Sequence, residues 1–179
     1  NRGIEAAQDR REWERGAWLL GAAEGKAMMV ENLMTKQVRT CSPSDTVAAA
    51  AHEMWDGDCG ALPVVEGAER RVVGVITDRD ICMAAYLEGH APCEAPVSRS
   101  MCREVRTCGP EDDLTVAHEE MREAQVRRLP VVDGDHQIVG IVSLNDLVIR
   151  AAGLGGNLAQ AMRTETLKTM AQRALDIAR

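Results

Sequence analysis

Two polar motifs in this chain could bind a ligand, because each places a hydroxyl residue three positions before an aspartate. Thr77 precedes Asp80, and Ser143 precedes Asp146, each after a glycine-led run of β-branched residues. A helix that begins at such a hydroxyl exposes N–H groups and a partial positive charge, which favour a phosphate group. The aspartate could accept hydrogen bonds from two neighbouring hydroxyls of a ligand. Either motif alone is more often an ordinary helix cap, and one hydroxyl could serve both purposes.

Both motifs belong to a sequence that occurs twice in the chain. The run Val38-Arg39-Thr40-Cys41 returns unchanged at residues 105–108, and Leu62-Pro63-Val64-Val65 returns at residues 129–132. A duplicated unit of this length is too small to bury its own apolar face. The two copies are therefore expected to pack against each other about a pseudo-twofold axis. Any cleft between them would be lined twice by equivalent residues.

Each copy is expected to begin with a short extended piece, at residues 38–40 and 105–107, followed by a helix. In the first copy Ser42-Pro43-Ser44-Asp45 resembles a capping box and predicts that the helix begins there. Apolar residues at helical spacing predict one buried stripe in each helix: Val47, Ala50, Ala51 and Met54 in the first, and Leu114, Ala117, His118 and Met121 in the second. We expect His118 to be packed rather than a ligand, since its counterpart is Ala51.

Two β-branched runs follow each helix and predict a hairpin in each copy. They span residues 62–65 and 71–77 in the first copy, and residues 129–132 and 137–143 in the second. The prolines Pro63 and Pro130 suggest edge or bulged positions whose neighbours keep free backbone groups. Each unit is thus β-α-β-β-α. The predicted fold class is α/β (α+β), with two such repeats facing each other and flanking helices at both ends.

The composition excludes several classes of partner. The net charge is −7 and the pI is near 5.2, which disfavours duplex DNA, other nucleic acid and an anionic membrane as main partners. No apolar run approaches the ~20 residues of a membrane span. Six cysteines without a Cys-x-x-Cys pair indicate free thiols in a reducing cytosol, with no metal site. We therefore expect a soluble, cytoplasmic protein.

The two ends of the chain are expected to be packing arms. Residues 1–29 carry Trp13, Ala17 and Leu20 on one helical face. Residues 157–179 carry a stronger face, made of Leu167, Met170, Ala171, Ala174 and Leu175. A module of this size cannot easily bury both faces, so we expect at least a homodimer. Because the first residue is Asn rather than Met, the sequence leaves open a longer parent chain.

The duplicated order of elements and the paired Gly-h-h-Thr/Ser-x-x-Asp runs resemble the CBS domain family, whose modules occur in tandem. The resemblance covers residues 30–92 and 97–153. It implies a non-catalytic, regulatory pair that binds an adenosine-containing ligand, such as AMP, ADP, ATP or S-adenosylmethionine, in the cleft between the repeats. It also implies that occupancy regulates an attached or associated partner protein. No cofactor is expected beyond this ligand, for which an adenine nucleotide is the leading candidate.

The resemblance assigns ligand contacts in both repeats. The aspartates would bind the ribose, the hydroxyl residues and helix N-termini the phosphates, and apolar residues with their backbone groups the adenine. We call the first ligand set Val38, Thr40, Leu62, Pro63, Thr77, Arg79 and Asp80. The second ligand set is Val105, Thr107, Arg128, Leu129, Pro130, Ser143 and Asp146. Val64 and Val131 could also line the adenine slots.

The basic residues break the symmetry of the two sets. Arg128 stands directly before Leu129, where members of the family often place a residue that reaches phosphate, whereas the first copy has Ala61. Arg79 is a further phosphate candidate, and its counterpart is Asn145. The two sites are therefore expected to differ in affinity.

A second function stays open, namely a dimerisation or scaffold module whose degenerate clefts bind nothing. Nucleic-acid binding is disfavoured by the acidic balance. An enzyme has the least support, because the sequence has no nucleophile–base pair, metal cluster or glycine-rich phosphate loop at diagnostic spacing. A measurement of whether the protein binds an adenosine-containing ligand distinguishes the regulatory module from the scaffold module.

Overall fold

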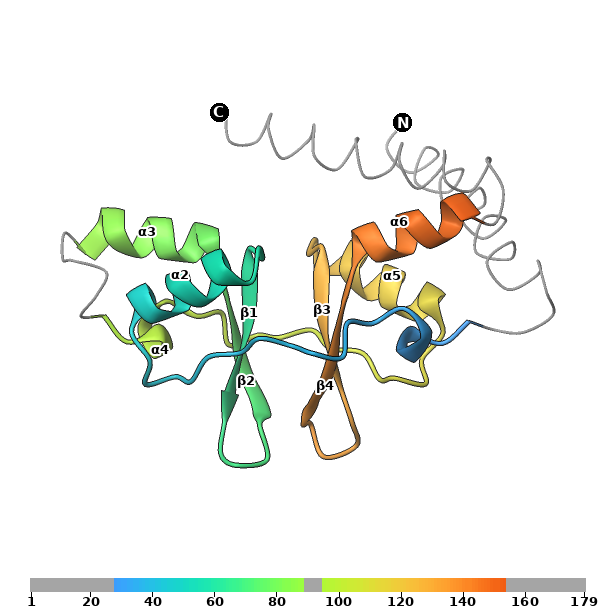
Figure 1. Ribbon diagram of the computed structural model, residues 1–179, viewed down its shortest axis with the longest axis horizontal. Coiled ribbons are helices and arrows are strands. Elements are labelled where there is room, and N and C mark those ends of the chain that lie inside the picture. The colour runs from blue at the N-terminus through green and yellow to red at the C-terminus, as the bar shows by residue number, and fades with distance from the viewer. Residues whose placement is uncertain (1–27, 89–94, 154–179) are drawn as a thin grey trace, which may run out of the picture. The chain divides into compact units, whose positions relative to one another are not determined.

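The structure, a computed structural model, describes residues 28–88 and 95–153 (Figure 1). The apolar faces predicted in the arms, from Trp13 to Leu20 and from Leu167 to Leu175, lie outside the described residues. The chain divides into two compact units. One unit, here the hairpin unit, contains Met34–Pro110 and Leu129–Val142. The other, here the helical unit, has residues 28–33, 111–128 and 143–153 as its described parts.

The order of helices and strands follows the predicted repeat. The first repeat contains α2 (Val47–Asp56), β1 (Ala61–Glu66), β2 (Arg71–Thr77) and α3 (Asp78–Glu88). The second contains α5 (Leu114–Glu123), β3 (Arg128–Val132), β4 (Ile138–Ser143) and α6 (Leu144–Gly153). The short helices η1 (Val30–Asn32) and α4 (Val97–Ser100) precede the two repeats' leading segments, which we define as residues 34–41 and 101–108. Strands β1 and β2 form one two-stranded sheet and β3 and β4 another, which confirms the mixed fold class (Figure 1).

The extended piece predicted at the start of each repeat is not a full strand. The residue after each predicted piece, Cys41 or Cys108, pairs with the hairpin of its own repeat through a single parallel bridge, to Val64 or Val131. The Cys41 N–H donates to the Pro63 carbonyl at 3.2 Å, and the Val65 N–H donates to the Cys41 carbonyl at 2.9 Å. Because proline has no N–H, the ladder cannot continue past Pro63. The register of the β1–β2 pair shifts between Val64 and Val65, next to Pro63 as the predicted bulge suggested, and the Pro63 carbonyl and the Val65 N–H beside the shift are both bonded to Cys41.

The first helix begins four residues later than Ser42-Pro43-Ser44-Asp45 suggested. The Asp45 carboxylate accepts from the Ser42 N–H at 2.7 Å and closes a turn rather than a helix cap. The N-cap is Thr46, whose hydroxyl accepts from the Ala49 N–H at 3.1 Å. Thr46 stays extended because its neighbours pair with the chain before α4: the Val47 N–H donates to the Ala95 carbonyl, and the Val97 N–H donates to the Asp45 carbonyl. A contact distant in sequence thus overrides the local capping signal.

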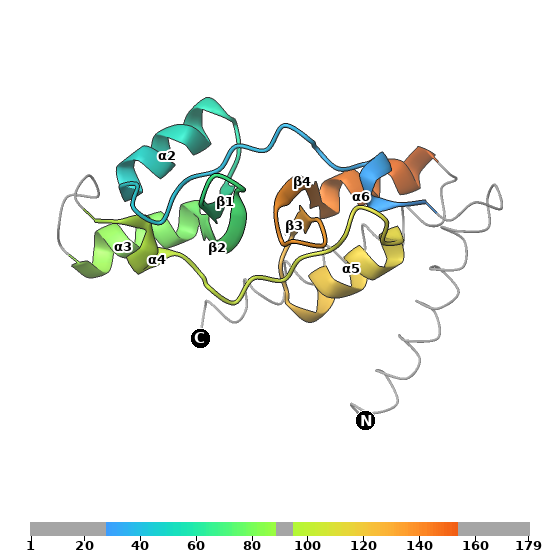
Figure 2. The same ribbon diagram turned by 90° about the horizontal axis from the view of Figure 1, so that it is seen from below.

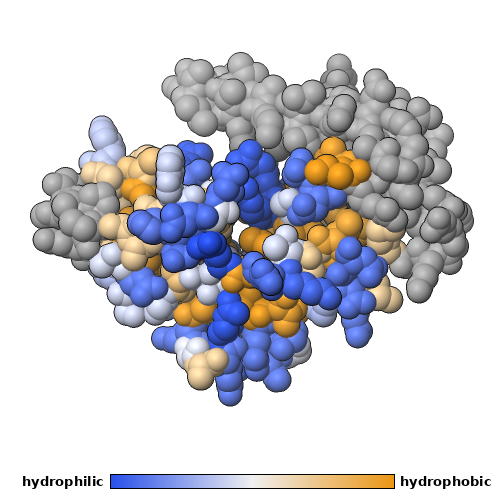
Figure 3. All heavy atoms as spheres, viewed as in Figure 1, coloured by the Kyte–Doolittle hydropathy of each residue, from blue (hydrophilic) through white to orange (hydrophobic). Residues whose placement is uncertain are grey.

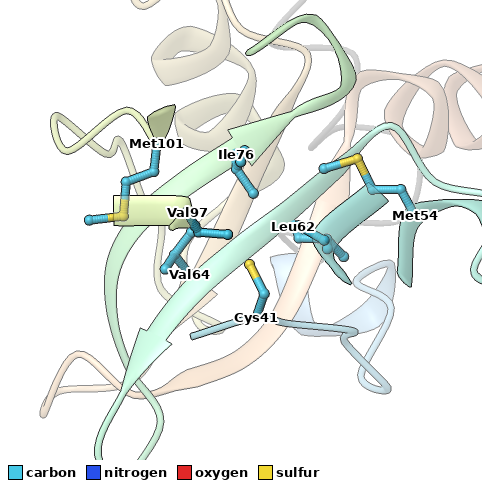
Figure 4. Packing of buried hydrophobic residues seen from close by; sticks show 8 residues of the cluster. Cys41, Met54, Leu62, Val64, Ile76, Val97 and Met101 are labelled. Atoms are coloured by element: carbon cyan, nitrogen blue, oxygen red, sulfur yellow. The ribbon is translucent and has the colours of Figure 1, made fainter. Parts of the chain in front are cut away.

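The predicted apolar stripes are confirmed in both helices. Helix α2 buries Val47, Ala50 and Met54, while Ala51 is half-buried. Helix α5 buries all four predicted residues, including His118. In the hairpin unit, the α2 stripe packs on β1 and β2 around the thiol of Cys41 (Figure 4). The cluster also contains Leu62, Val64, Ile76, Val97 and Met101.

The pseudo-twofold packing of the repeats is visible in a second apolar cluster of the hairpin unit. It consists of three pairs of repeat-equivalent residues: Val38 with Val105, Val65 with Val132, and Val72 with Ile138. Beside it the backbone makes two equivalent hydrogen bonds: the Val72 N–H donates to the His136 carbonyl at 3.1 Å, and the Ile138 N–H donates to the Arg70 carbonyl at 3.2 Å. The two hairpins are therefore joined both by side chains and by backbone.

Each leading segment also pairs with the hairpin of the other repeat. Thr35 bridges to Ile141 of β4, and Cys102 bridges to Val75 of β2. Figure 2 shows the two segments passing the paired hairpins on opposite sides. Next to each of these bridges, a methionine of the leading segment packs against a glycine of the other repeat's hairpin: Met34 against Gly140, and Met101 against Gly74. The repeats are therefore intertwined, as their small size required.

Candidate functional site

The first candidate motif forms a complete capping box at the start of α3. The Thr77 N–H and hydroxyl both donate to Asp80 Oδ2, at 2.9 and 2.7 Å. In return, the Asp80 N–H donates to Thr77 Oγ1 at 3.3 Å. The helix begins here because Thr77 ends β2 and its side chain satisfies a donor of the first turn.

The second motif has the same geometry at the start of α6. The Ser143 N–H and hydroxyl donate to Asp146 Oδ2 at 2.8 and 2.6 Å, and the Asp146 N–H donates to Ser143 Oγ at 3.2 Å. The interpretation as a helix cap is therefore correct in both repeats. All four side chains are half-buried.

The caps leave one oxygen of each aspartate available. Within the described residues, only Oδ2 of Asp80 and of Asp146 accepts hydrogen bonds, and Oδ1 accepts none. A carboxylate held at Oδ2 by two donors has a fixed orientation and can still accept at Oδ1. The Thr77 and Ser143 hydroxyl protons are engaged by these carboxylates, so they are not available to donate to a phosphate. The cap and a ligand site are compatible for the aspartates, but the expected donation from the hydroxyls to phosphate requires breaking the cap.

The two helix starts differ in charge. In α3 the carboxylate of Asp78 accepts from the Arg79 N–H at 2.7 Å, and the Asp78 N–H donates to the Gly60 carbonyl at 3.3 Å. In the first turn of α3, the Asp78 carboxylate thus already accepts from a backbone N–H that a phosphate would otherwise use. In α6 the equivalent of Asp78 is Leu144, which brings no carboxylate.

The apolar members of the ligand sets lie mostly in the core. Leu62 and Leu129 have no exposed surface, and Pro63 and Pro130 are also buried. Val64 and Val131, the other slot candidates, are equally buried. Through their side chains these residues stabilise the fold, so any contact with a base would use their backbone groups or require rearrangement.

The leading segments carry the remaining apolar candidates at half-buried positions. Val38 and Val105 belong to the shared valine cluster, and Thr40 and Thr107 are partly accessible beside them. The whole first ligand set belongs to the hairpin unit. The second set is divided, because Arg128, Ser143 and Asp146 belong to the helical unit.

The cationic candidates are exposed. Arg79 on α3 and Arg128 at the start of β3 both lie on the surface. Arg128 follows Arg127, whose carbonyl accepts from the Leu144 N–H at 2.9 Å. This bond ties the segment just before Arg128 to the first turn of α6. Arg128, the residue expected at a phosphate, therefore directly follows a residue whose backbone is bonded to that helix start in the helical unit.

Two polar residues near the first ligand set were not anticipated. The Arg70 guanidinium donates from Nη2 to the Val38 carbonyl at 3.1 Å and to Thr40 Oγ1 at 3.2 Å. Asp78, described above, is the other. Asp78 could have been noticed in the sequence as an extra acid inside the motif, whereas Arg70 stands in a hairpin turn, and only the folded chain brings it to residues 38–40.

The described residues do not support an alternative centre of chemistry. No group of three His, Cys, Asp or Glu side chains among them could hold a metal ion. The buried Cys41 is not a nucleophile, because burial raises the pKa of its thiol to about 12, with the charges of Asp45 and Glu53 adding to the shift. None of the helices in residues 28–88 and 95–153 combines the length and hydropathy that a membrane crossing requires.

Comparison with known proteins places the chain. The family model for the CBS domain matches twice, over residues 30–86 and 97–153. A CBS domain-containing protein of Bacillus subtilis, YhcV, is 40% identical over 120 residues, which cover 67% of this chain and 83% of that protein. The inosine-5'-monophosphate dehydrogenase of Methanocaldococcus jannaschii is 35% identical over 121 residues, which cover 67% of this chain but only 23% of the enzyme.

A solved structure shares the fold. The CBS domain pair of protein MJ0100, in complex with 5'-methylthioadenosine and S-adenosyl-L-methionine, superposes with a TM-score of 0.65 at 23% identity. The match covers 72% of this chain and 99% of that chain. Together with the two family matches and the intertwined repeats described above, this similarity shows that the chain belongs to the CBS domain family as a tandem pair.

Proposed function

We propose that this CBS pair is a non-catalytic regulatory module that binds an adenosine-containing ligand and transmits occupancy to a partner. The observation that carries the proposal is the arrangement of Asp80 and Asp146. In both repeats the carboxylate is fixed at Oδ2 by a hydroxyl and an N–H, with Oδ1 open. A preorganised acceptor of this kind suits the vicinal hydroxyls of a ribose.

The two ligand sites are proposed to differ in their preference for phosphate. Asp78 and Asp80 place two carboxylates in the first turn of α3, which opposes an anionic ligand group. The start of α6 carries only Asp146, and Arg128 belongs to the second ligand set. We therefore assign nucleotides to the second set, and adenosine ligands without phosphate to the first.

The site is proposed to act through protein contacts. Met83 on α3 and Ile149 on α6 are repeat-equivalent and are 44% and 63% exposed, which is high for apolar side chains. Such residues suit a homodimer or a regulated partner protein. A cytoplasmic location fits the free thiols found at all five described cysteines.

Calorimetric titration of the aspartate variants tests the proposal. Asp80→Asn and Asp146→Asn should each remove one site, with a loss of ~1.5–3 kcal/mol at that site for the charged hydrogen bonds. Asparagine retains an oxygen that can cap the helix, so the fold should persist. If both variants bind with unchanged stoichiometry and affinity, the aspartates are only caps. A wild-type protein that binds no adenosine ligand would favour a scaffold role.

Arg128→Ala tests the preference for phosphate. Affinity for AMP should fall about 10–100-fold, corresponding to ~1.5–3 kcal/mol of charge-assisted hydrogen bonding, while affinity for adenosine should hardly change. Asp78→Asn is the matched variant in the other repeat, and it should improve AMP binding at the first set. Equal losses for AMP and adenosine in Arg128→Ala would show damage to the fold rather than loss of a phosphate contact.

A further inference from the structure

Arg70 connects three separate parts of the hairpin unit. It lies in the turn between β1 and β2 with a left-handed backbone, at φ 53°, and its N–H donates to the Gly67 carbonyl at 3.2 Å. Its carbonyl accepts from the Ile138 N–H at the start of β4. Its side chain reaches the leading segment of the first repeat. One residue thus links a hairpin turn, the other repeat and a segment of the first ligand set.

The side chain of Arg70 grips that segment at two points. Guanidinium Nη2 donates to the Val38 carbonyl at 3.1 Å and to Thr40 Oγ1 at 3.2 Å. Both acceptors belong to the first ligand set, and they lie on either side of Arg39. Val38 is also packed in the shared valine cluster, and Cys41, the next residue after Thr40, bonds to Pro63. The segment is therefore fixed at successive residues, and Arg70 supplies the fixation at Val38 and Thr40.

The second repeat has no equivalent pair of side-chain hydrogen bonds among its described residues. The residue equivalent to Arg70 is His136, which has the same left-handed backbone, at φ 67°, and whose carbonyl accepts from the Val72 N–H. In the part of the chain that the structure describes, the His136 side chain makes no hydrogen bond to Val105 or Thr107. The backbone connections are the same in both repeats, and the side-chain connection exists only in the first.

We propose that Arg70 is a positioning residue that orders residues 38–40 for ligand binding, so that the first site is preorganised and the second is not. The proposal rests on the proposed ligand-binding function. A segment that is already ordered loses less conformational entropy when a ligand binds it. The donors are charged, so each hydrogen bond is stronger than one between neutral groups, although the side chain lies at the exposed hairpin tip.

The surroundings of Arg70 allow a matched control. Figure 3 shows hydrophilic side chains gathered over the hairpin tips at the bottom of the view. Arg71, the neighbour of Arg70, is also exposed and has the same charge, but within the described residues its side chain makes no hydrogen bond. A variant at Arg71 therefore changes the same net charge without touching the leading segment.

Reciprocal exchange of the two residues is the test, with Arg70→His, His136→Arg and the control Arg71→His. Histidine already occupies the left-handed position in the second repeat, so Arg70→His should fold. The first measurement needs no ligand: hydrogen exchange of the Cys41 and Cys108 amides, which donate to the Pro63 and Pro130 carbonyls. Arg70→His should speed exchange at Cys41 several-fold and leave Cys108 unchanged. His136→Arg should slow exchange at Cys108.

The second measurement is calorimetric titration with adenosine. Arg70→His should weaken the first site about 3–10-fold, as expected for one or two exposed charge-assisted hydrogen bonds. Arg70→Lys, which keeps a cationic donor, should recover part of that loss, and Arg71→His should have no effect.

The outcomes separate the inference from the function on which it rests. Unchanged exchange at Cys41 in Arg70→His overturns the proposed ordering. Faster exchange with unchanged adenosine affinity shows that residues 38–40 are ordered by Arg70 but do not contribute to the site, which overturns its role in binding. If the wild-type protein binds no adenosine ligand, the proposed function fails, and the exchange data still decide whether Arg70 orders the segment.

Discussion

The two repeats have nearly the same backbone and different polar side chains. Left-handed residues occur at equivalent places, with Asp58 matched by Gln125 and Arg70 by His136. The cross-repeat hydrogen bonds of the hairpins and of the leading segments also occur in equivalent pairs. The residue types at these positions nevertheless differ. The packing of the repeats is therefore specified by backbone geometry and the apolar core, and chemical differences are tolerated where only the side chain is involved.

The same division separates stability from function in this pair. The valine cluster and the capping boxes are present in both repeats, so they account for the fold. Asp78, Arg70 and Arg128 occur in one repeat each, opposite Leu144, His136 and Ala61. The difference expected between the two sites should arise at these positions and at Arg79, which is opposite Asn145. The following predictions test how far the equivalence of the repeats extends, from the largest expected effect to the smallest.

The largest effect on stability is expected from substitutions at Gly74 and Gly140, the two glycines against which Met101 and Met34 pack. A Cβ on Gly74 would lie 2.7 Å from Met101 Sδ and 3.1 Å from the Cys102 carbonyl oxygen. Met101 is buried and the carbonyl is fixed in a bridge, so neither can move easily. At Gly140 the nearest atoms all belong to the side chain of Met34, which is only half-buried. Gly74→Ala should destabilise by ~3 kcal/mol, and Gly140→Ala by only ~1 kcal/mol.

Urea unfolding of both variants measures this difference. Gly74→Ala combined with Met101→Ala should recover little, because the backbone oxygen remains. Gly140→Ala combined with Met34→Ala should recover most of the cost of the added methyl group, because the truncation removes Sδ and Cγ of Met34 and leaves only its Cβ, at 3.2 Å. Equal destabilisation by the two glycine substitutions would mean that the two leading segments are equally rigid where they pack on the hairpins.

Much of this architecture could be predicted from the sequence, and the failures have a common cause. The repeat, the apolar stripes and the Thr77-x-x-Asp80 cap depend on neighbours along the chain, and the sequence contains them. The start of α2 and the single bridges at Cys41 and Cys108 depend on partners distant in sequence, such as Ala95. For the site, the aspartates could be identified, whereas the contact from Arg70 to Val38 depends on the folded hairpin.

A second effect is expected from the thiol of Cys41 at high pH. The pKa of this thiol rises from its ordinary value of 9.0 to about 12 because burial disfavours the thiolate. The folded protein therefore holds the proton more tightly than the unfolded chain. The stability that depends on the neutral thiol is complete below pH 9 and is lost as the pH rises toward 12, by ~2 kcal/mol at about pH 11.

Unfolding free energies between pH 8 and 11 check this loss. Cys41→Ala should flatten the dependence. With iodoacetamide at pH 8, the exposed Cys82 and Cys102 should react in the folded protein and Cys41 only after unfolding. Alkylation of Cys41 at the rate of Cys82 would contradict its burial.

A smaller effect distinguishes the two helices at low pH. His118 of α5 is buried, and burial lowers the pKa of its imidazole, a shift that Glu119 opposes and Arg122 reinforces. The neutral imidazole therefore contributes stability above its ordinary value of 6.5, and this contribution is lost as the pH falls below it. We therefore expect the protein to be less stable at pH 5 than at pH 8. The equivalent Ala51 cannot titrate, so His118→Ala should remove the dependence at a packing cost measurable at pH 8.

The smallest effect concerns the residues that end α2 and α5. Each helix ends in a Schellman motif: the Cys59 N–H donates to the Met54 carbonyl at 3.0 Å, and the Val126 N–H donates to the Met121 carbonyl at 2.9 Å. The motif places Asp58 at φ 46° and Gln125 at φ 53°, where a Cβ is unfavourable. Aspartate tolerates this region better than glutamine does. Gln125→Gly should therefore be ~1 kcal/mol more stable than Gln125→Ala, and the same comparison at Asp58 should give a similar difference.

Thermal unfolding of the glycine and alanine variants isolates the strain, because both remove the native side chain and only alanine keeps a Cβ. The wild-type residues provide the comparison between repeats. Asp58→Gly should raise the free energy of unfolding above wild type by less than Gln125→Gly does. Contacts of the Gln125 side chain would offset its backbone strain, and the loss of stability in Gln125→Ala measures those contacts. If the glycine and alanine variants are equally stable at both positions, the left-handed conformation of Asp58 and Gln125 carries no strain. The two repeats would then share this backbone geometry at no cost in stability.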